Sequence, residues 1–136
     1  MIAELRDYLK TLNVADYYYI GKIENSKEKV LGIYPNSSTP RVEAVGKDSS
    51  YGTFGVRLLL HWNKNAKDTE IQALSLFDHI RYIQDTDMTH YEDTGQSSTV
   101  HVQFIDWDYD DPVFVGTDAN GVYEYVITGT IYYQKG

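Results

Sequence analysis

Four carboxylates fall within the six residues Asp106 to Asp111. Asp106, Asp108 and Asp110 have the i, i+2, i+4 spacing of a calcium-binding loop. The rest of that pattern fails, because Asp111 stands where the loop needs glycine and Thr117 where it needs a bidentate glutamate. On a strand the three carboxylates would share one face and repel one another unless they were solvated or bound to a cation. The segment therefore predicts an exposed acidic strand end, with a weak cation site or a metal-dependent hydrolase as alternatives.

Two aromatic residues, Trp107 and Tyr109, alternate with these acids. Alternation on a strand places them on the opposite face from the carboxylates. They either cover the other face of the sheet or form an aromatic patch that faces a partner. The pattern leaves both readings open.

Other catalytic signatures are not found. The chain has no cysteine, which excludes a thiolate zinc site and a cysteine nucleophile. It has no phosphate-binding glycine loop, no G-x-S-x-G elbow and no H-E-x-x-H motif. His61, His79, His90 and His101 lack ligand-like spacing, and we expect His61 and His101 to be half-exposed on outer strand faces. We therefore predict neither a catalytic residue nor a cofactor.

Charge is distributed very unevenly along the chain. Residues 1–81 contain 11 Lys and Arg and 10 Asp and Glu, whereas residues 82–134 contain 10 Asp and Glu and no Lys or Arg. A wholly acidic segment argues against tight binding to a nucleic-acid backbone. The simplest interpretation is a solvated acidic surface.

The 136 residues are predicted to form one domain, 1–136. No apolar run approaches the length that a membrane span requires, and charges occupy the place of a signal-peptide core, so we expect a soluble protein made in a cytoplasm. Thirteen tyrosines are unusual and suit surfaces that a partner covers.

Periodicity predicts two helices, over 2–12 and 67–83. Thr69 and Gln72 fit a capping box for the second helix. Its core stripe consists of Ala73, Leu76, Phe77, Ile80 and Ile83. Ile71 and Tyr82 lie nearly opposite that stripe, which indicates a second apolar surface.

Five strands are expected. Residues 17–23 and 30–34 should form a hairpin, and residues 54–62 are the clearest strand because apolar residues alternate strictly. Residues 100–107 alternate again, with Val100, Val102 and Phe104 inward, and residues 122–133 follow a tight turn. Residues 35–50 are predicted to be a long loop, and 85–99 a loop or a weak hairpin. This order predicts an α+β sandwich with a mainly antiparallel sheet covered by two helices.

The order of these pieces resembles bacteriophage minor capsid proteins that are related to the tail terminators of long-tailed phages. The resemblance rests on IAELRDYLKTLNV, YYIGKIENSKEKVLGIYP, LLLHWNKNAKDTEIQA and PVFVGTDANGVYEYVITGTIYYQK. The last segment is the most specific and includes Pro112, Val113, Gly116, Thr117, Asp118, Gly121, Glu124 and Tyr125. Residues 84–111, and with them the acidic cluster, lie outside the resemblance.

The resemblance implies a structural virion protein without catalysis, encoded by a phage or prophage and made in the host cytoplasm. Such proteins form a ring, typically a hexamer, that caps the tail tube and joins it to head-completion proteins. For such a ring we expect two subunit contacts: Ile71 and Tyr82 on the second helix, and the loop that contains Arg41 and ends near Tyr51. Asp106, Asp108, Asp110 and Asp111 are the expected lumen-facing acids.

Two other classes of protein stay open. One is an immunity or antitoxin-like module whose acidic half neutralises a basic partner. The other is the hydrolase built on Asp106, Asp108 and Asp110. A stable monomer that captures a basic protein would favour the first, and an activity lost on mutating the three acids would favour the second.

Overall fold

The described part of the chain forms two helices and seven strands. The computed structural model describes residues 1–24, 26–36 and 51–135. In chain order the elements are α1 (Ile2–Thr11), β1 (Tyr17–Ile20), β2 (Val30–Pro35), β3 (Tyr51–His61), α2 (Ala66–Ile80), β4 (Gln84–Tyr91), β5 (Ser97–Trp107), β6 (Val113–Thr117) and β7 (Tyr123–Lys135).

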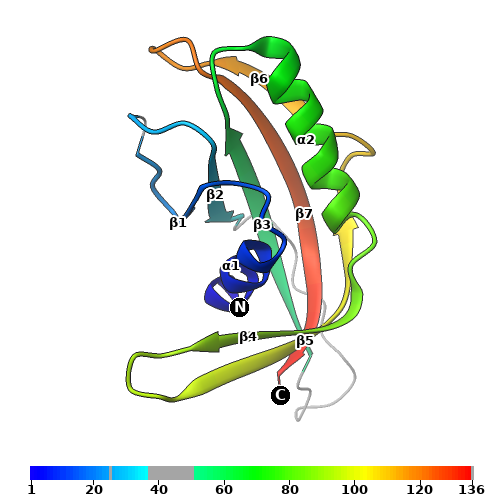
Figure 1. Cartoon of the computed structure of the whole chain (residues 1–136). Helices are drawn as coiled ribbons and strands as arrows, with labels where there is room; N and C mark the ends of the chain where they lie inside the picture. Colours follow the sequence, from blue (N-terminus) through cyan, green and yellow to red (C-terminus); the bar gives the residue numbers. More distant parts are fainter. Residues whose placement is uncertain (25, 37–50, 136) are drawn as a thin grey trace.

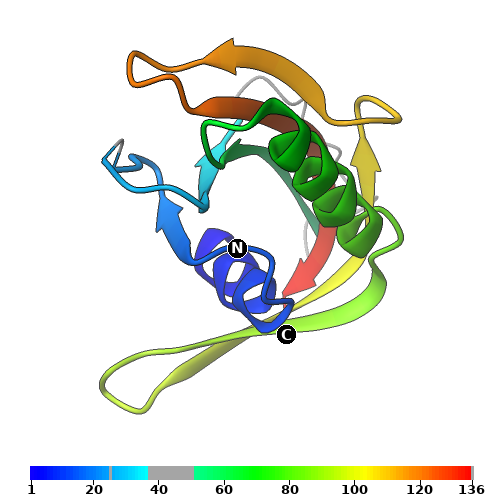
Figure 2. The same cartoon turned by 45° about the horizontal axis from the view of Figure 1, so that its top comes forward.

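The strands form one sheet that curls strongly around the two helices (Figure 1). The strand order is β1-β2-β3-β7-β5-β4, and β6 pairs with the first part of β7 while β5 pairs with its later part. Figure 2 shows both helices on the concave side, so the convex side is free of helices. The predicted α+β fold, with a mainly antiparallel sheet covered by two helices, is confirmed.

The core lies between the helices and the concave face of the sheet. Leu5 and Leu9 of α1 are buried there. The predicted core stripe of α2 is confirmed, since Ala73, Leu76, Phe77 and Ile80 are buried and Ile83 is buried just beyond the helix end.

The alternation predicted for β3 also holds. Val56, Leu58 and Leu60 face the core and are at most 2% exposed, whereas Arg57 between them is exposed. Strand β3 lies between β2 and β7, with Leu58 opposite both Ile33 and Ile127. The centre of the sheet is therefore its most apolar part.

The N-terminus of α2 differs from the predicted capping box. Asn65 is the N-cap, and its side-chain oxygen accepts a hydrogen bond from the Asp68 N–H at 3.0 Å. Thr69 lies inside the helix and is fully buried, and its hydroxyl donates to the Asn65 carbonyl oxygen at 2.9 Å. Asparagine is as good an N-cap as threonine, and it stands directly before the helical residues.

The predicted hairpin of the first two strands is wrong, because β1 and β2 pair in parallel. A four-residue strand advances only about 13 Å, so a short connection can return to its start. Two backbone bonds hold the connection: the Gly21 N–H donates to Ile33 O at 2.9 Å, and the Lys29 N–H to Trp62 O at 2.7 Å. Gly21 and Lys29 both have positive φ, which redirects the chain.

The prediction that Phe104 faces inward is also wrong. A register shift between Val102 and Phe104 marks a β-bulge in β5. One extra residue in the ladder exchanges the two faces of the strand beyond it. Val100 and Val102 are buried as expected, but Ile105 takes the inward place and Phe104 is 47% exposed.

Two strands lie where the sequence indicates little β-structure. The polar segment 84–99 forms β4 and the start of β5, so of the two forms predicted there the hairpin is the one present. Strand β6 was not expected. It pairs with β7 across the turn at Asp118, whose carboxylate accepts hydrogen bonds from the Asn120 and Val122 N–H groups. That turn was predicted from its Asn-Gly pair.

Candidate interaction surfaces

The acidic cluster is divided between two places. Asp106 and Asp108 lie at the end of β5 on the helix-free face: Asp106 is opposite Thr130, and the Thr128 hydroxyl donates to Asp108 Oδ2 at 2.7 Å. Asp110 and Asp111 lie in the bend that leads to β6. All four are exposed, and within the described parts of the chain no lysine or arginine forms an ion pair with them.

These carboxylates do not assemble into a metal site. Among residues 1–24, 26–36 and 51–135 no group of three or more His, Asp or Glu side chains is arranged to hold a metal ion. The hydrolase interpretation required Asp106, Asp108 and Asp110 to converge, and the structure gives it no support.

The two aromatic residues of this segment lie in different environments. Trp107 faces the helices and meets Phe77 edge to face, with ring centroids 5.9 Å apart. Tyr109 is 63% exposed. Of the two candidate partner-facing aromatics, Tyr109 is thus the accessible one.

The candidate contacts on the second helix are exposed, although α2 ends at Ile80, before the predicted end at residue 83, so Tyr82 lies in the turn that follows it. Ile71 is 57% and Tyr82 77% exposed, and the Arg81 guanidinium lies 5.1 Å from the centre of the Tyr82 ring. Arg41 lies outside the described residues, and of Tyr51 the structure describes the backbone, which is opposite Gln134.

Strands β1 and β6 carry a further set of exposed apolar side chains. Tyr17 and Ile20 of β1 are 39% and 37% exposed, and in β6 Val113, Phe114 and Val115 are 39%, 54% and 52% exposed. Sequence reasoning missed both sets, because β1 was assigned to an internal hairpin and β6 was not recognised as a strand.

Three histidines each lie between two carboxylates. His61 is fully buried, against the expectation of half exposure, with Nδ1 2.9 Å from Glu124 Oε2 and Nε2 3.6 Å from Asp118 Oδ2. His101 Nδ1 lies 2.8 Å from Asp87 Oδ1, and this hydrogen bond raises the pKa of His101. The partners of His61 are distant in sequence and meet it through the pairing of β3 with β7.

His90 links the hairpin of β4 and β5 to α1. Its Nδ1 lies 2.7 Å from Asp7 Oδ2. This hydrogen bond raises the pKa of His90, although partial desolvation acts in the opposite direction. Burial alone would raise the pKa of Asp7, but the hydrogen bonds from His90 and Arg6 outweigh it and lower that pKa. The Ser98 hydroxyl also donates to Glu4 Oε2 at 2.7 Å, so two polar contacts hold the hairpin to α1.

These features define a class of protein. The described residues present exposed strand edges, exposed apolar side chains on and near α2, and a helix-free face with exposed carboxylates, on which Arg57 also lies. No described helix is long and apolar enough to cross a membrane. Surfaces of this kind are typical of a protein whose work is contact with other proteins.

The chain belongs to the bacteriophage tail terminator family, since the family model for bacteriophage tail terminator proteins matches residues 8–135. No curated protein matches the chain. The family match confirms the resemblance seen in the sequence and extends it over residues 84–111. The protein is therefore a structural component of the phage virion that acts at the tail with other tail and head proteins.

Proposed function

We propose that the protein caps the tail tube as a closed ring and joins it to the head-completion proteins, without catalysis. The match to the tail terminator family over residues 8–135 carries this proposal. A ring of six copies is the expected form. The tail-tube protein lies on one side of the ring and a head-completion protein on the other.

A ring of identical subunits needs two different patches on each copy. We assign the exposed side of α2 with Ile71, and Tyr82 just beyond the end of that helix, to the contact region. Burial raises the pKa of Tyr125 in β7, and the carboxylate of Glu70 on α2 adds to this effect. The Tyr125 ring lies 5.4 Å from the Phe114 ring of β6, and β6 lies beside α2 in Figure 1.

The helix-free face supports a second part of the proposal, which is that the acidic segment lines the DNA path. Asp106 and Asp108 are on this face, as are the carboxylates of Asp85 and Asp87 around His101. Phosphates are repelled by such a wall, so DNA would pass without binding to it. Asp110 and Asp111 adjoin it at the sheet edge.

Mixing the purified protein with tail tubes tests the function. Negative-stain images should show an added disc at one end of each tube, and phages that lack the protein should have tails of uncontrolled length without heads. Tyr82→Arg should weaken capping. Tyr91→Arg is the matched control, because Tyr91 is 72% exposed on β4, away from α2. Uncapped tubes at saturating wild-type protein would reject the proposal.

A further inference from the structure

Strands β1, β2, β3, β7 and β6 lie side by side in that order, and β1 and β6 form the two open edges of this part of the sheet. Among the described residues β1 pairs only with β2, and β6 only with β7. An open edge presents backbone N–H and C=O groups that can pair with a strand of another chain. The strands are also matched in length, with four residues in β1 and five in β6.

Both edge strands are short and β6 contains a register shift between Phe114 and Gly116, but neither strand has the charged side chains that protect many sheet edges. Strands β1 (YYYI) and β6 (VFVGT) contain no charged residue, and most of their apolar side chains are partly exposed. Strand β4 is different: it carries Asp85 and Asp87, and α1 holds it through the Asp7–His90 contact. Charged edges resist strand addition, whereas apolar ones invite it.

The strand directions allow β6 of one copy to continue the sheet into β1 of the next. Strand β1 is parallel to β2, and the steps from β2 to β3, β3 to β7 and β7 to β6 are all antiparallel. Strands β1 and β6 therefore run in opposite directions. Rotation about a ring axis that runs along the strands preserves these directions, so β6 would meet the next β1 in antiparallel orientation.

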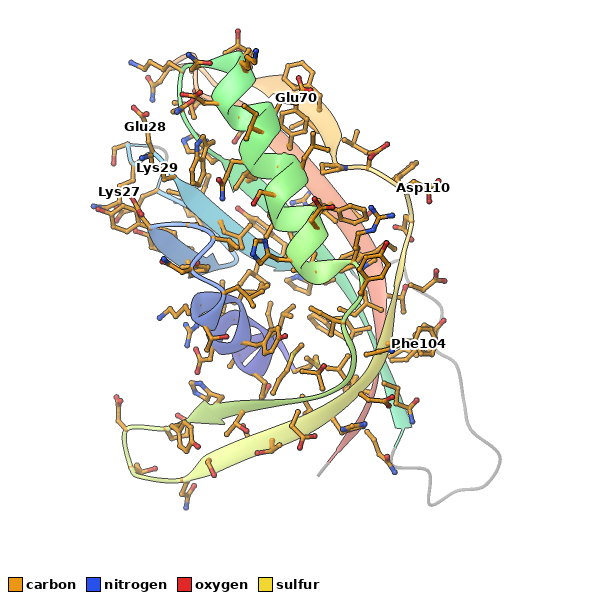
Figure 3. The ribbon with its side chains drawn as sticks, turned by 45° about the vertical axis from the view of Figure 1, so that its right-hand side comes forward. Lys27, Glu28, Lys29, Glu70, Phe104 and Asp110 are labelled. Atoms are coloured by element: carbon orange, nitrogen blue, oxygen red, sulfur yellow. The ribbon has the colours of Figure 1, made fainter. Side chains whose placement is uncertain are left out.

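Antiparallel pairing brings opposite charges together at one end of the contact. It places the start of β6, which follows Asp110 and Asp111, beside the end of β1, which precedes Lys22. At the other end Asp118 comes near Asp16, but the Asp118 carboxylate already accepts hydrogen bonds from the Asn120 and Val122 N–H groups of its own turn. Figure 3 shows Asp110 on the opposite side of the molecule from Lys27 and Lys29, which follow β1. Glu24 and Glu28 lie among these lysines, so the charges select partner and register more than they add affinity.

Pairing of β6 with another β6 is disfavoured by the same charges. The antiparallel form would place Asp110 and Asp111 beside Asp118 of the other copy, and the parallel form would place them beside each other. Because residues 82–134 contain no lysine or arginine, a lysine or arginine partner for these acids in a ring must come from the earlier part of the chain or from Lys135. This favours a head-to-tail contact over a twofold one.

We propose that the ring closes by addition of β6 of one copy to β1 of the next in antiparallel orientation, with Asp110 and Asp111 beside Lys22. This proposal rests on the ring described under the proposed function. It specifies the seam, by which we mean the contact between β6 of one subunit and β1 of the next. The exposed side of α2 would lie next to that seam.

Cross-linking tests the seam directly, because the chain has no cysteine of its own. Ile20 and Val113 are equally exposed and would be neighbours in the antiparallel pair. Ile20→Cys/Val113→Cys protein seated on tail tubes should give, on oxidation or with a short bismaleimide, a ladder of covalent multimers that ends at the subunit number of the ring. Each single-cysteine variant should stay almost entirely monomeric, and Tyr91→Cys/Val113→Cys is the matched control.

The possible results of the cross-linking experiment test the seam and the capping function separately. Protein that caps tubes but gives no ladder, or single variants that form mainly homodimers, would overturn the seam and leave the capping function intact. Ladders that close into rings on protein that never seats on tubes would support the seam and reject the joining function.

Charge reversal gives an independent test. Lys22→Glu should slow formation of the ladder several-fold, and so should Asp110→Lys/Asp111→Lys, whereas the combination should recover most of the rate. Asp93→Lys, at the exposed tip of the hairpin of β4 and β5, is the control. Equal and additive losses in the combined variant would show that these residues do not meet.

Discussion

The contact between Asp7 and His90 joins two parts of the chain that are 83 residues apart in sequence. Both members have shifted pKa values: that of His90 is raised and that of Asp7 is lowered. A raised histidine pKa stabilises the fold below the ordinary value of about 6.5, and this stabilisation is lost as the pH rises through the folded-state pKa. A lowered aspartate pKa acts in the other direction, so its contribution is lost as the pH falls through the folded-state value.

We therefore expect the contact to stabilise the fold most between about pH 4 and 6.5 and to lose strength toward alkaline pH. Replacement of His90 by Gln should lower the free energy of unfolding more at pH 5.5 than at pH 8.5. Urea denaturation at the two pH values measures this difference. His79→Gln is the control, because His79 contacts the carbonyl oxygen of Ser75 on its own helix. An equal loss for His90→Gln at both pH values would contradict the assignment.

No local pattern could have identified the histidine contacts. His61 precedes Glu124 by 63 residues, and the two become neighbours only because residues 51–61 pair with residues 124–134 in one register. Alternation placed His61 correctly on the face opposite Leu60. Its burial was missed because the turn at Asp118 and the start of β7 close over that part of the outer face.

Among the elements, β5 offers the sharpest test of the fold. Its bulge turns Phe104 outward to stack on Tyr132 at 4.5 Å and turns Ile105 into the core. Ile105→Ala should cost about 2–4 kcal/mol, because it removes buried methylene groups and leaves a cavity. Phe104→Ala should cost about 1 kcal/mol, which is mainly the stacking contact. Thermal denaturation of both variants shows which one loses more stability. A larger loss of stability for Phe104→Ala would place the bulge elsewhere.

Strand β3 provides a test of which face is the core. Leu58 is 1% exposed, and an aspartate there would bury a charge without a partner, so Leu58→Asp should not fold. Arg57→Asp is the matched control, because Arg57 is the adjacent residue on the opposite, exposed face and should tolerate the change. The yield and melting of the two purified variants provide the measurement. A Leu58→Asp variant that melts cooperatively would contradict the assignment.

The sequence could predict elements whose periodicity decides their packing. Both helices and β3 are of this kind, since their apolar residues repeat at the helical or strand period. It could not predict the bulge in β5, because inserting one residue leaves each half of the strand with normal alternation. The parallel pairing of β1 with β2 was also missed, because it depends on backbone bonds from Gly21 to Ile33 of β2 and from Lys29 to Trp62, which follows β3.

At the scale of the whole molecule, the curl of the sheet gives it two very different faces. The helices fill the concave side (Figure 2), and the opposite face carries the exposed carboxylates of Asp106 and Asp108. In a ring closed through strand edges, one face of the sheet is turned toward the axis. If the face with Asp106 and Asp108 is turned toward the axis, the acidic residues of the chain would repel the phosphates of passing DNA.

The lumen proposal is tested by reversing charge on this face. At physiological salt the Debye length is about 8 Å, so only carboxylates close to the DNA path affect its passage. Asp106→Lys/Asp108→Lys should leave folding and tail capping intact, because both side chains are exposed and neither residue belongs to β1 or β6. DNA ejection from phages that carry the variant should be slower, since lysines near the path bind phosphates through counterion release. Ejection followed by dye fluorescence after receptor addition measures the rate.

Two comparisons make this result specific to the helix-free face. Glu92→Lys/Asp93→Lys changes the charge by the same amount at the exposed tip of the hairpin of β4 and β5, and it should eject DNA at the wild-type rate. Asp106→Asn/Asp108→Asn removes the repulsion without adding attraction and should give an intermediate rate. The delay of the lysine variant should also shrink as the salt concentration rises, because phosphate contacts weaken with salt. Wild-type ejection by the Asp106→Lys/Asp108→Lys phages, with the ring seen in place by electron microscopy, would show that this face does not line the DNA path.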